Sequence, residues 1–433
     1  MKKTTLQTGA LWMRITIVLL LAGQLFLLGG CRTLPTRVVS DPAPAELRLR
    51  AGGSIKAEVD YLAQPLVMTG QIHGIAVGVL TDDGSVNAFG YGRTGVPGDV
   101  QLPDGDTIFQ IGSVSKLFLT ALLSVLVDEG VLRYEDTVRS ILSEEVQLDE
   151  EAGKVTIYEL ATNTGGFPRQ PFTQSQMWDF FGFLFTGRNL YGYFDKPYLY
   201  DYLREKHPKP KQPREYVYSN IGLGLLGHLI EVKTGRPFQD LLEEKICRPL
   251  KLRNTTFVLT EEQKGRLAIG HAGDQPYFMR RGRPMAPWEM GEIMRPSGGL
   301  YSTVNDLLTF AKSNFGMLNN SLDPLLARTQ VIQLKRPEQD VAFGWLVNYL
   351  GEDRLKVTYK QGLMSGYTSY IGMSAENRVA VVVLYNTFSW DEKVGHNLVL
   401  RLARGLSPHQ TGTPFKLPSV TQPSPSRTEQ NKN

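Results

Sequence analysis

The chain contains 433 residues, of which 42% are hydrophobic and 21% are charged. This balance is typical of a folded protein with a large core, and it excludes a wholly disordered, fibrous or multi-span membrane protein. The formal charge of +4 falls to about +1 without the three basic residues of the first 30 positions. The net charge therefore gives no indication of a nucleic-acid partner, and we predict none.

The first 30 residues have the pattern of a secretory leader. Lys2, Lys3 and Arg14 accompany an apolar run over residues 15–28, which is short for a membrane-spanning helix. The run ends in Leu-Gly-Gly-Cys, which resembles the bacterial lipobox, with Cys31 as the lipid-modified first residue of the mature chain. The alternative is an ordinary cleaved signal peptide. The resemblance implies a protein of the cell envelope, anchored to a membrane through its N-terminal lipid. No aspartate follows Cys31. If the organism is Gram-negative, the resemblance therefore implies that the protein is located on the periplasmic face of the outer membrane.

The two ends of the mature chain differ from the part between them. Residues 31–50 carry prolines and mixed charges without a sustained period, which predicts a tether. Residues 407–433 are rich in Pro, Ser, Thr and Gln and lack an apolar pattern, which predicts a disordered tail. One folded domain is therefore expected over residues 51–406.

Strand patterns occur near both ends of this domain. The hydrophobic patterns predict two hairpins and a closing helix, over residues 75–81 with 86–91, residues 367–373 with 379–385, and residues 391–403. Strands at both ends with helices between them predict an α+β fold. We expect an antiparallel sheet built from both chain ends, about 51–112 and 335–406, flanked by helices. A mainly helical part, about 113–334, is inserted between them.

The first chemical signal is a Ser-x-x-Lys pattern, Ser113 to Lys116, directly before an apolar helical run over residues 117–127. Residues three apart share one face of a helix, so the ammonium group is expected next to the hydroxyl. An apolar environment lowers the pKa of a lysine, which makes it a plausible base for a serine nucleophile. Taken alone the pattern is weak, since a capping serine and a lysine reaching the surface would look the same.

Two further motifs strengthen the interpretation of Ser113 and Lys116 as catalytic residues. Tyr218-Ser219-Asn220 follows 105 residues after Ser113, and Lys360-Gln361-Gly362 follows 142 residues after Tyr218. In this order and spacing the three motifs resemble those of the serine β-lactamase and penicillin-binding-protein superfamily, specifically its class C branch. Two supporting blocks of that branch are also matched, at residues 160–168 and 297–303. The likeness extends over about residues 57–403 and implies a β-lactamase/D,D-peptidase-like fold.

The resemblance assigns catalytic roles to three side chains. Ser113 would be the acylated nucleophile and Lys116 its proton partner. Tyr218 would act as general acid or base, and two nearby cations, Lys116 and Lys360, would lower the pKa of its phenol.

The resemblance also implies a substrate-binding set. Asn220 would hold Lys116 and the substrate amide, and Lys360 would attract the terminal carboxylate of the substrate. Gly362 completes the third motif. The backbone N–H groups of Ser113 and Leu363 would form the oxyanion hole.

Two residues depart from the family pattern. Gln361 replaces the usual threonine of the third motif and removes a hydroxyl that can bind a carboxylate, which affects substrate preference more than acylation. Asn163 replaces a common histidine in a supporting block, and we expect little consequence from that change.

Three other features of the sequence could indicate a binding site. Residues 222–227 satisfy Gly-x-Gly-x-x-Gly, but the surrounding strands and helices of a dinucleotide fold are missing, so close helix packing is the better interpretation. The histidines show no ligand spacing, and we predict neither a metal nor a cofactor. Residues 172–202 hold 12 aromatic side chains, which would either line a substrate wall or pack a helical core.

The sequence therefore predicts a serine hydrolase that works through a covalent acyl-enzyme. Our first choice is a D,D-carboxypeptidase or endopeptidase acting on peptidoglycan peptides. The alternatives are a class C-like β-lactamase or an esterase, with a β-lactam or an ester as substrate, because one acylation apparatus can serve all of them. A further alternative is a lipoprotein that binds cell-wall peptides without catalysis.

Overall fold

A computed structural model of the chain describes residues 54–95, 101–171, 174–205 and 215–405. The predicted signal peptide, the lipidated Cys31, the tether and the C-terminal tail lie outside the described residues, so these remain predictions. Within the described ranges no helix is both long and apolar enough to cross a membrane.

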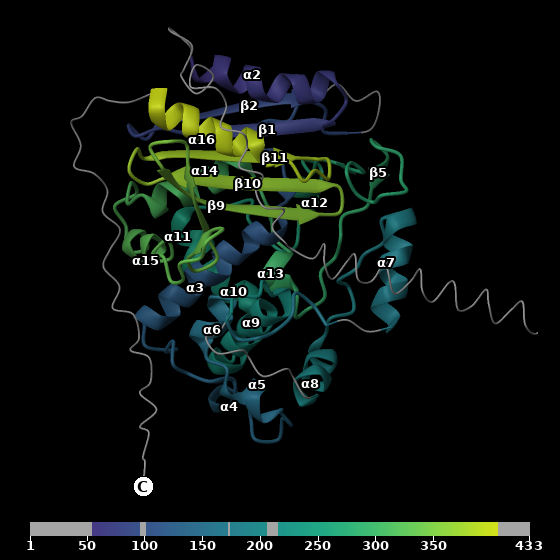
Figure 1. The fold of residues 1–433 in the computed structure, drawn as a ribbon, viewed down its shortest axis with the longest axis vertical. Coiled ribbons are helices and arrows are strands. Elements are labelled where there is room, and N and C mark those ends of the chain that lie inside the picture. Colours follow the sequence, from purple (N-terminus) through teal and green to yellow (C-terminus); the bar gives the residue numbers. More distant parts are fainter. Residues whose placement is uncertain (1–53, 96–100, 172–173, 206–214, 406–433) are drawn as a thin grey trace, which may run out of the picture.

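The centre of the molecule is a seven-stranded antiparallel sheet with the order β2-β1-β11-β10-β9-β8-β7 (Figure 1). Its strands are β1 (Gly74–Leu80), β2 (Val86–Gly92), β7 (Asp340–Val341), β8 (Leu346–Leu350), β9 (Leu355–Met364), β10 (Tyr367–Ser374) and β11 (Val379–Tyr385). Four two-residue strands form two separate small antiparallel sheets, β3 (Phe109–Gln110) with β6 (Tyr301–Ser302) and β4 (Gly270–His271) with β5 (Pro284–Met285). The two chain ends meet where β1 pairs with β11, which confirms the predicted α+β fold with a sheet built from both ends.

The pairing of β1 with β11 follows from their side-chain pattern. Alternate residues of β1 face opposite sides of the sheet, so Ile75, Val77 and Val79 enter one core and Ala76 and Leu80 enter the other. Both strands are buried along their whole length, which explains why each is almost continuously apolar. A strand of this kind is stable only in the middle of a sheet that is covered on both faces.

Helices cover both faces of the sheet (Figure 1). Helices α2 and α16 pack on one face, and α14 packs on β1 and β11 from the other. The longer helices are α2 (Ile55–Met68), α3 (Ser115–Asp128), α7 (Gln174–Thr186), α8 (Lys196–Arg204), α9 (Asn220–Thr234), α14 (Val304–Asn314) and α16 (Lys393–Gly405). The shorter ones are α4 (Val138–Ile141), α5 (Glu150–Lys154), α6 (Ile157–Ala161), α10 (Phe238–Leu242), α11 (Arg248–Leu250), α12 (Glu261–Lys264), α13 (Arg295–Gly298) and α15 (Asp323–Arg328), with a π-helical turn at Glu243–Cys247.

Helix α3 forms the centre of the helical part. Twelve of its 14 residues are buried, so nearly the whole helix lacks a solvent face and its sequence is mainly apolar. It ends before Gly130, whose φ of +71° lies in the left-handed region that glycine adopts without strain. Helix α9, which follows Tyr218, packs close to α13: an ideal Cβ on Gly224 would lie 2.4 Å from the carbonyl oxygen of Ile293. This contact supports helix packing as the role of the glycine-rich pattern at residues 222–227.

A buried ion pair joins the two ends of the folded chain. Arg401 on α16 donates to Glu58 on α2 at 2.5 Å, and both side chains are less than 8% exposed. We expect Arg401→Leu to destabilise the protein by about 3–5 kcal/mol, because it leaves a carboxylate buried without its cation. Urea unfolding measures this change. The double variant Glu58→Leu/Arg401→Leu should recover most of the loss, and equal stability of the single and double variants would contradict the argument.

Candidate active site

Ser113 lies in a short 3₁₀ turn, Gly112–Val114, between β3 and α3. Gly112 has a φ of +49°, and an ideal Cβ there would lie 2.8 Å from the backbone nitrogen of Leu363 on β9. Only glycine allows the turn to approach the strand this closely. The turn is also tied to the sheet by Ser369 on β10, whose hydroxyl donates to the carbonyl oxygen of Ile111 at 2.7 Å.

The turn brings three predicted side chains into hydrogen-bond contact. Lys116 Nζ donates to Ser113 Oγ at 3.0 Å, as expected for residues three apart in tight helical geometry. Ser113 Oγ also lies 2.7 Å from Tyr218 Oη. The serine hydroxyl is therefore within proton-transfer distance of two groups that can act as its base. Ser113 and Tyr218 are both partly exposed, so the site opens to solvent.

Lys116 is 1% exposed and is held from the opposite side by the backbone carbonyl of Ser297, at 2.6 Å. Burial lowers the pKa of Lys116 well below its usual value, and the positive charges of Lys360 and Arg169 lower it further. A lowered pKa increases the fraction of Lys116 that is a neutral amine, which is the form that accepts a proton.

Three basic side chains surround the ring of Tyr218. The ammonium nitrogens of Lys116 and Lys360 each lie 5.1 Å from the ring centroid, and the guanidinium carbon of Arg169 lies 5.5 Å from it. Lys360 is 3% exposed and projects from the central part of β9. The positive charges of Lys360 and Arg169 attract an anionic substrate.

The predicted oxyanion donors lie on two backbones in close contact. An ideal Cβ on Gly362 would lie 2.0 Å from the carbonyl oxygen of Ile111 and 2.9 Å from the backbone nitrogen of Ser113. Together with the approach of Gly112 to Leu363, this brings the Ser113 turn and the Gly362–Leu363 segment of β9 side by side. The arrangement suits two N–H groups that bind one oxygen atom.

Asn163 contacts the backbone on both sides of Tyr218. Its backbone carbonyl accepts from the N–H of Val217, and its side-chain oxygen accepts from the N–H of Ser219, both at 2.9 Å. The two bonds bracket Tyr218. Asn163 adopts a φ of +58°, a conformation that asparagine tolerates better than most residues. Asn163 therefore holds the backbone on both sides of Tyr218, and the expectation that its replacement of histidine has little consequence stays a prediction.

Two other side chains differ from what the family pattern implied. In the described part of the chain, Lys116 bonds to Ser113 and Ser297, and no hydrogen bond joins it to Asn220. Asn220 is buried, and its backbone N–H donates to the carbonyl oxygen of Arg169 at 2.8 Å. The side-chain nitrogen of Gln361 is buried and has no hydrogen-bond partner among the described residues.

Sequence reasoning missed Arg169 and Ser297. Arg169 directly follows the supporting block at residues 160–168. A basic residue next to that block was the sequence feature that could have indicated a site residue. Ser297 contributes only a backbone carbonyl, which every residue type carries, so its contact with Lys116 had no signal beyond its place in the second supporting block.

Arg169 gives a testable pH effect. Because its charge lowers the pKa of Lys116, the variant Arg169→Gln should let that pKa rise. The neutral amine would then be lost at higher pH, so the acid limb of the acylation rate profile should move to higher pH. The charge-conserving Arg169→Lys should keep the profile, and Arg133→Gln, which changes an exposed arginine, is the matched control. An unchanged acid limb in Arg169→Gln would contradict this role.

Two cavities of about 260 and 270 Å³ lie elsewhere, one between α2 and the segment around Arg281 and the other between α10 and residues 255–258. Neither is lined by the residues around Ser113. The described residues contain no group of three or more His, Cys, Asp or Glu that could hold a metal ion.

A seven-stranded antiparallel sheet packed against a helical part is the fold of solved class C β-lactamases. The class C beta lactamase from Rhodobacter sphaeroides superposes with a TM-score of 0.66 at 22% identity, over 80% of this chain and 99% of that one. A family model described as Beta-lactamase matches residues 59–405. The chain therefore belongs to the Beta-lactamase family, whose members are mostly serine hydrolases.

The similar proteins include more than one activity. The D-alanyl-D-alanine-carboxypeptidase/endopeptidase AmpH of Escherichia coli (strain K12) is 26% identical over 342 residues, or 75% of this chain and 82% of that protein. The beta-lactamase of Lysobacter lactamgenus is 28% identical over 280 residues, or 64% of each chain.

Proposed function

We propose that this protein hydrolyses D-alanyl peptides of peptidoglycan, as a D,D-carboxypeptidase or endopeptidase, through an acyl-enzyme on Ser113. The observation that carries the proposal is the contact of Ser113 Oγ with both Lys116 Nζ and Tyr218 Oη, next to the close approach of β9. Attack on the substrate carbonyl would form the Ser113 ester and release the terminal D-alanine, with the proton passing through Lys116 or Tyr218. Water would then cleave the ester.

The substrate class is supported by the charge of the site and by one relative. Lys360 and Arg169 add to the positive charge around Tyr218, which suits a peptide that ends in a carboxylate. The similarity to AmpH extends over three quarters of the chain, which favours a peptidase. The similarity to the Lysobacter lactamgenus enzyme makes a β-lactamase the second candidate.

Labelling with a fluorescent penicillin, followed by substrate profiling, tests the proposal. The purified protein should form a covalent adduct, and mass spectrometry should locate it on Ser113. Turnover of muropeptides should then exceed turnover of nitrocefin and of a p-nitrophenyl ester. The absence of any adduct would favour a binding protein, faster nitrocefin hydrolysis would favour a β-lactamase, and turnover of the ester alone would exclude the peptidase.

We also propose that the protein is anchored in the cell envelope by a lipid on Cys31. The support is the leader pattern that ends in Leu-Gly-Gly-Cys. Metabolic incorporation of an alkyne fatty acid should label the wild-type protein and not Cys31→Ser. Equal labelling of both, or of neither, would contradict the anchor.

A further inference from the structure

The aromatic-rich segment at residues 172–202 has two different faces where it forms α7. Phe183 is buried and meets Trp288 with ring centroids 5.5 Å apart, so this face packs into the core. Trp178, Phe181 and Phe185 follow the spacing i, i+3, i+7 and therefore share another face. Trp178 and Phe185 are 56% and 57% exposed. The predicted core packing thus explains only part of the segment.

A loop between β4 and β5 extends the exposed face. The N–H of Phe278 donates to the carbonyl oxygen of Leu184 at 3.0 Å, and the ring of Phe278 stacks on Phe185 at 4.6 Å. Tyr277 lies edge-on to Phe278 at 5.2 Å. Tyr277 and Phe278 are 72% and 58% exposed. We call the surface formed by Trp178, Phe181, Phe185, Tyr277 and Phe278 the aromatic edge.

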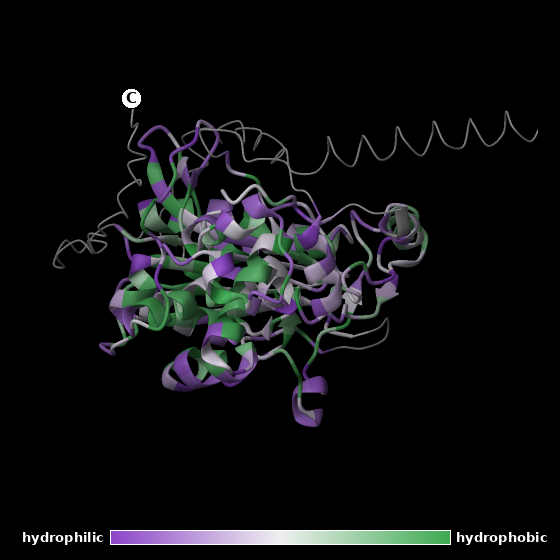
Figure 2. Cartoon of the chain, turned by 90° about the horizontal axis from the view of Figure 1, so that it is seen from below, coloured by the Kyte–Doolittle hydropathy of each residue, from purple (hydrophilic) through white to green (hydrophobic). Residues whose placement is uncertain are grey.

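The aromatic edge is unusual within this protein. Five aromatic side chains of the described residues are more than half exposed, and four of them belong to it. Helix α7 lies at one margin of the molecule in both ribbon views, and it carries hydrophobic residues there (Figures 1 and 2). The rings therefore point outward from a protruding element, which suits a broad partner better than a small ligand in a cavity.

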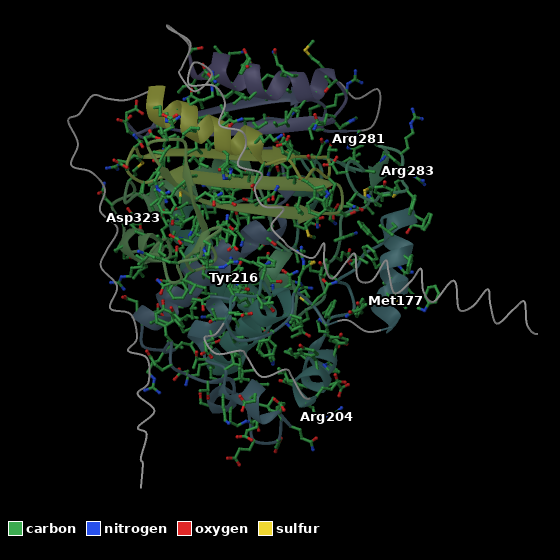
Figure 3. The ribbon with its side chains drawn as sticks, in the orientation of Figure 1. Met177, Arg204, Tyr216, Arg281, Arg283 and Asp323 are labelled. Carbon is green, nitrogen blue, oxygen red and sulfur yellow. The ribbon has the colours of Figure 1, made fainter. Side chains whose placement is uncertain are left out.

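Positive charge accompanies these rings. Arg280 and Arg283 are exposed, and neither forms an ion pair within the described part of the chain. Arg281 is paired with Asp274 at 2.5 Å and adds no net charge. Figure 3 shows Arg281 and Arg283 on the same side of the molecule as Met177 of α7. Exposed aromatic rings next to unpaired arginines are typical of surfaces that bind the interface of an anionic bilayer.

We infer that the aromatic edge docks onto the surface of an anionic lipid bilayer. The rings would enter the boundary between headgroups and acyl chains, and Arg280 and Arg283 would contact lipid phosphates. The predicted lipid on Cys31 lies 23 residues before Ser54, and an extended chain of that length spans at most about 80 Å, so an anchored domain could turn this edge toward the membrane.

Docking there would orient the active site. The indole N–H of Trp288, beneath α7, donates to the carbonyl oxygen of Gly187 at 3.0 Å. The side chain of Gln110 in turn bonds to the backbone N–H and carbonyl of Trp288, at 3.1 and 2.7 Å. Gln110 lies three residues before Ser113. Gly187 directly follows α7, so hydrogen bonds through Trp288 join the end of the helix that carries the aromatic edge to β3, the strand that leads into the catalytic turn.

A fluorescent probe in the aromatic edge tests the proposal on the full chain. Phe278→Cys is labelled with an environment-sensitive dye and compared with Ser321→Cys, an exposed position two residues before Asp323. Figure 3 places Asp323 on the side of the molecule away from Met177. Of the two native cysteines, Cys247 is buried and should not react, and the proposed lipid would block the thiol of Cys31. With vesicles containing phosphatidylglycerol, brominated lipids should quench the probe at position 278 at least about threefold more than the probe at position 321, because only position 278 would reach the acyl boundary.

The charge contribution is tested by Arg280→Glu/Arg283→Glu. This variant should weaken the vesicle-dependent signal at position 278 by about tenfold or more, since each basic residue near an anionic surface contributes about 1 kcal/mol. Zwitterionic vesicles should show no such difference. Penicillin labelling of Ser113 should stay unchanged, which confirms folding and separates this proposal from the hydrolase activity. Equal quenching at both positions, or a signal at position 278 that responds only to peptidoglycan sacculi or to protein concentration, would overturn the proposal.

Discussion

Ser113→Ala should abolish acylation, lowering the rate of penicillin labelling and of substrate turnover by about 10⁴-fold or more. The reason is that the hydroxyl contacted by both Lys116 and Tyr218 is the atom that would form the ester bond. The overall fold should persist, because the side chain is partly exposed and the turn is held by backbone contacts with β9. Stopped-flow labelling and thermal melting measure the two effects separately.

A second serine of the same region provides the control. Ser124 lies on α3 and donates to the carbonyl oxygen of Leu325 at 2.9 Å, away from the site. Ser124→Ala should cost about 1 kcal/mol of stability and leave the acylation rate unchanged. If Ser113→Ala retained more than about one hundredth of the wild-type rate, another nucleophile would have to exist and the proposed function would be wrong.

Lys116 should be needed as a neutral amine and not as a positive charge. Lys116→Met and Lys116→Arg should both lower the acylation rate by about 10²–10⁴-fold, the usual contribution of a general base. Arginine retains its proton at all accessible pH values, so it cannot accept the proton of Ser113. The wild-type acylation rate should increase as the pH rises through the lowered pKa of Lys116. At lower pH the rate should decrease, because protonation of Lys116 removes the base.

The two variants distinguish the possible roles of Lys116. If the residue served only to attract anions, Lys116→Arg would keep a rate within about tenfold of the wild type. The methionine variant, close in length and uncharged, shows whether a loss in the arginine variant reflects chemistry or crowding at this buried position. Lys264→Met, at an exposed lysine paired only with Glu261, should leave the acylation rate unchanged.

The hairpins and the reactive residue types could be predicted because their signals are local. Short apolar or β-branched runs separated by turn residues identify β1, β2, β10 and β11, and the structure has these strands within one residue of the predicted bounds. The turn between β1 and β2 has the sequence Asp82-Asp83-Gly84, and Gly84 adopts a φ of +82°, which glycine allows without strain. The Ser-x-x-Lys spacing likewise predicted the contact between Ser113 and Lys116.

The position of each strand in the sheet had no local signal. β11 lies between β1 and β10 because only a central strand buries an apolar run on both of its faces. A periodic pattern shows which residues are apolar, but it does not show which distant strand they meet.

The sequence by itself determined which chemical groups this protein can use: a hydroxyl, two amines, a phenol and a glycine-containing strand, in a fixed order. Only the tertiary structure decided how these groups behave. The pKa of Lys116 depends on its burial and on cations from two other segments, and one of these segments also supplies Asn163, which holds Tyr218 in place. These effects arise from water exclusion and charge proximity between residues far apart in the chain, so no single stretch of sequence carries them.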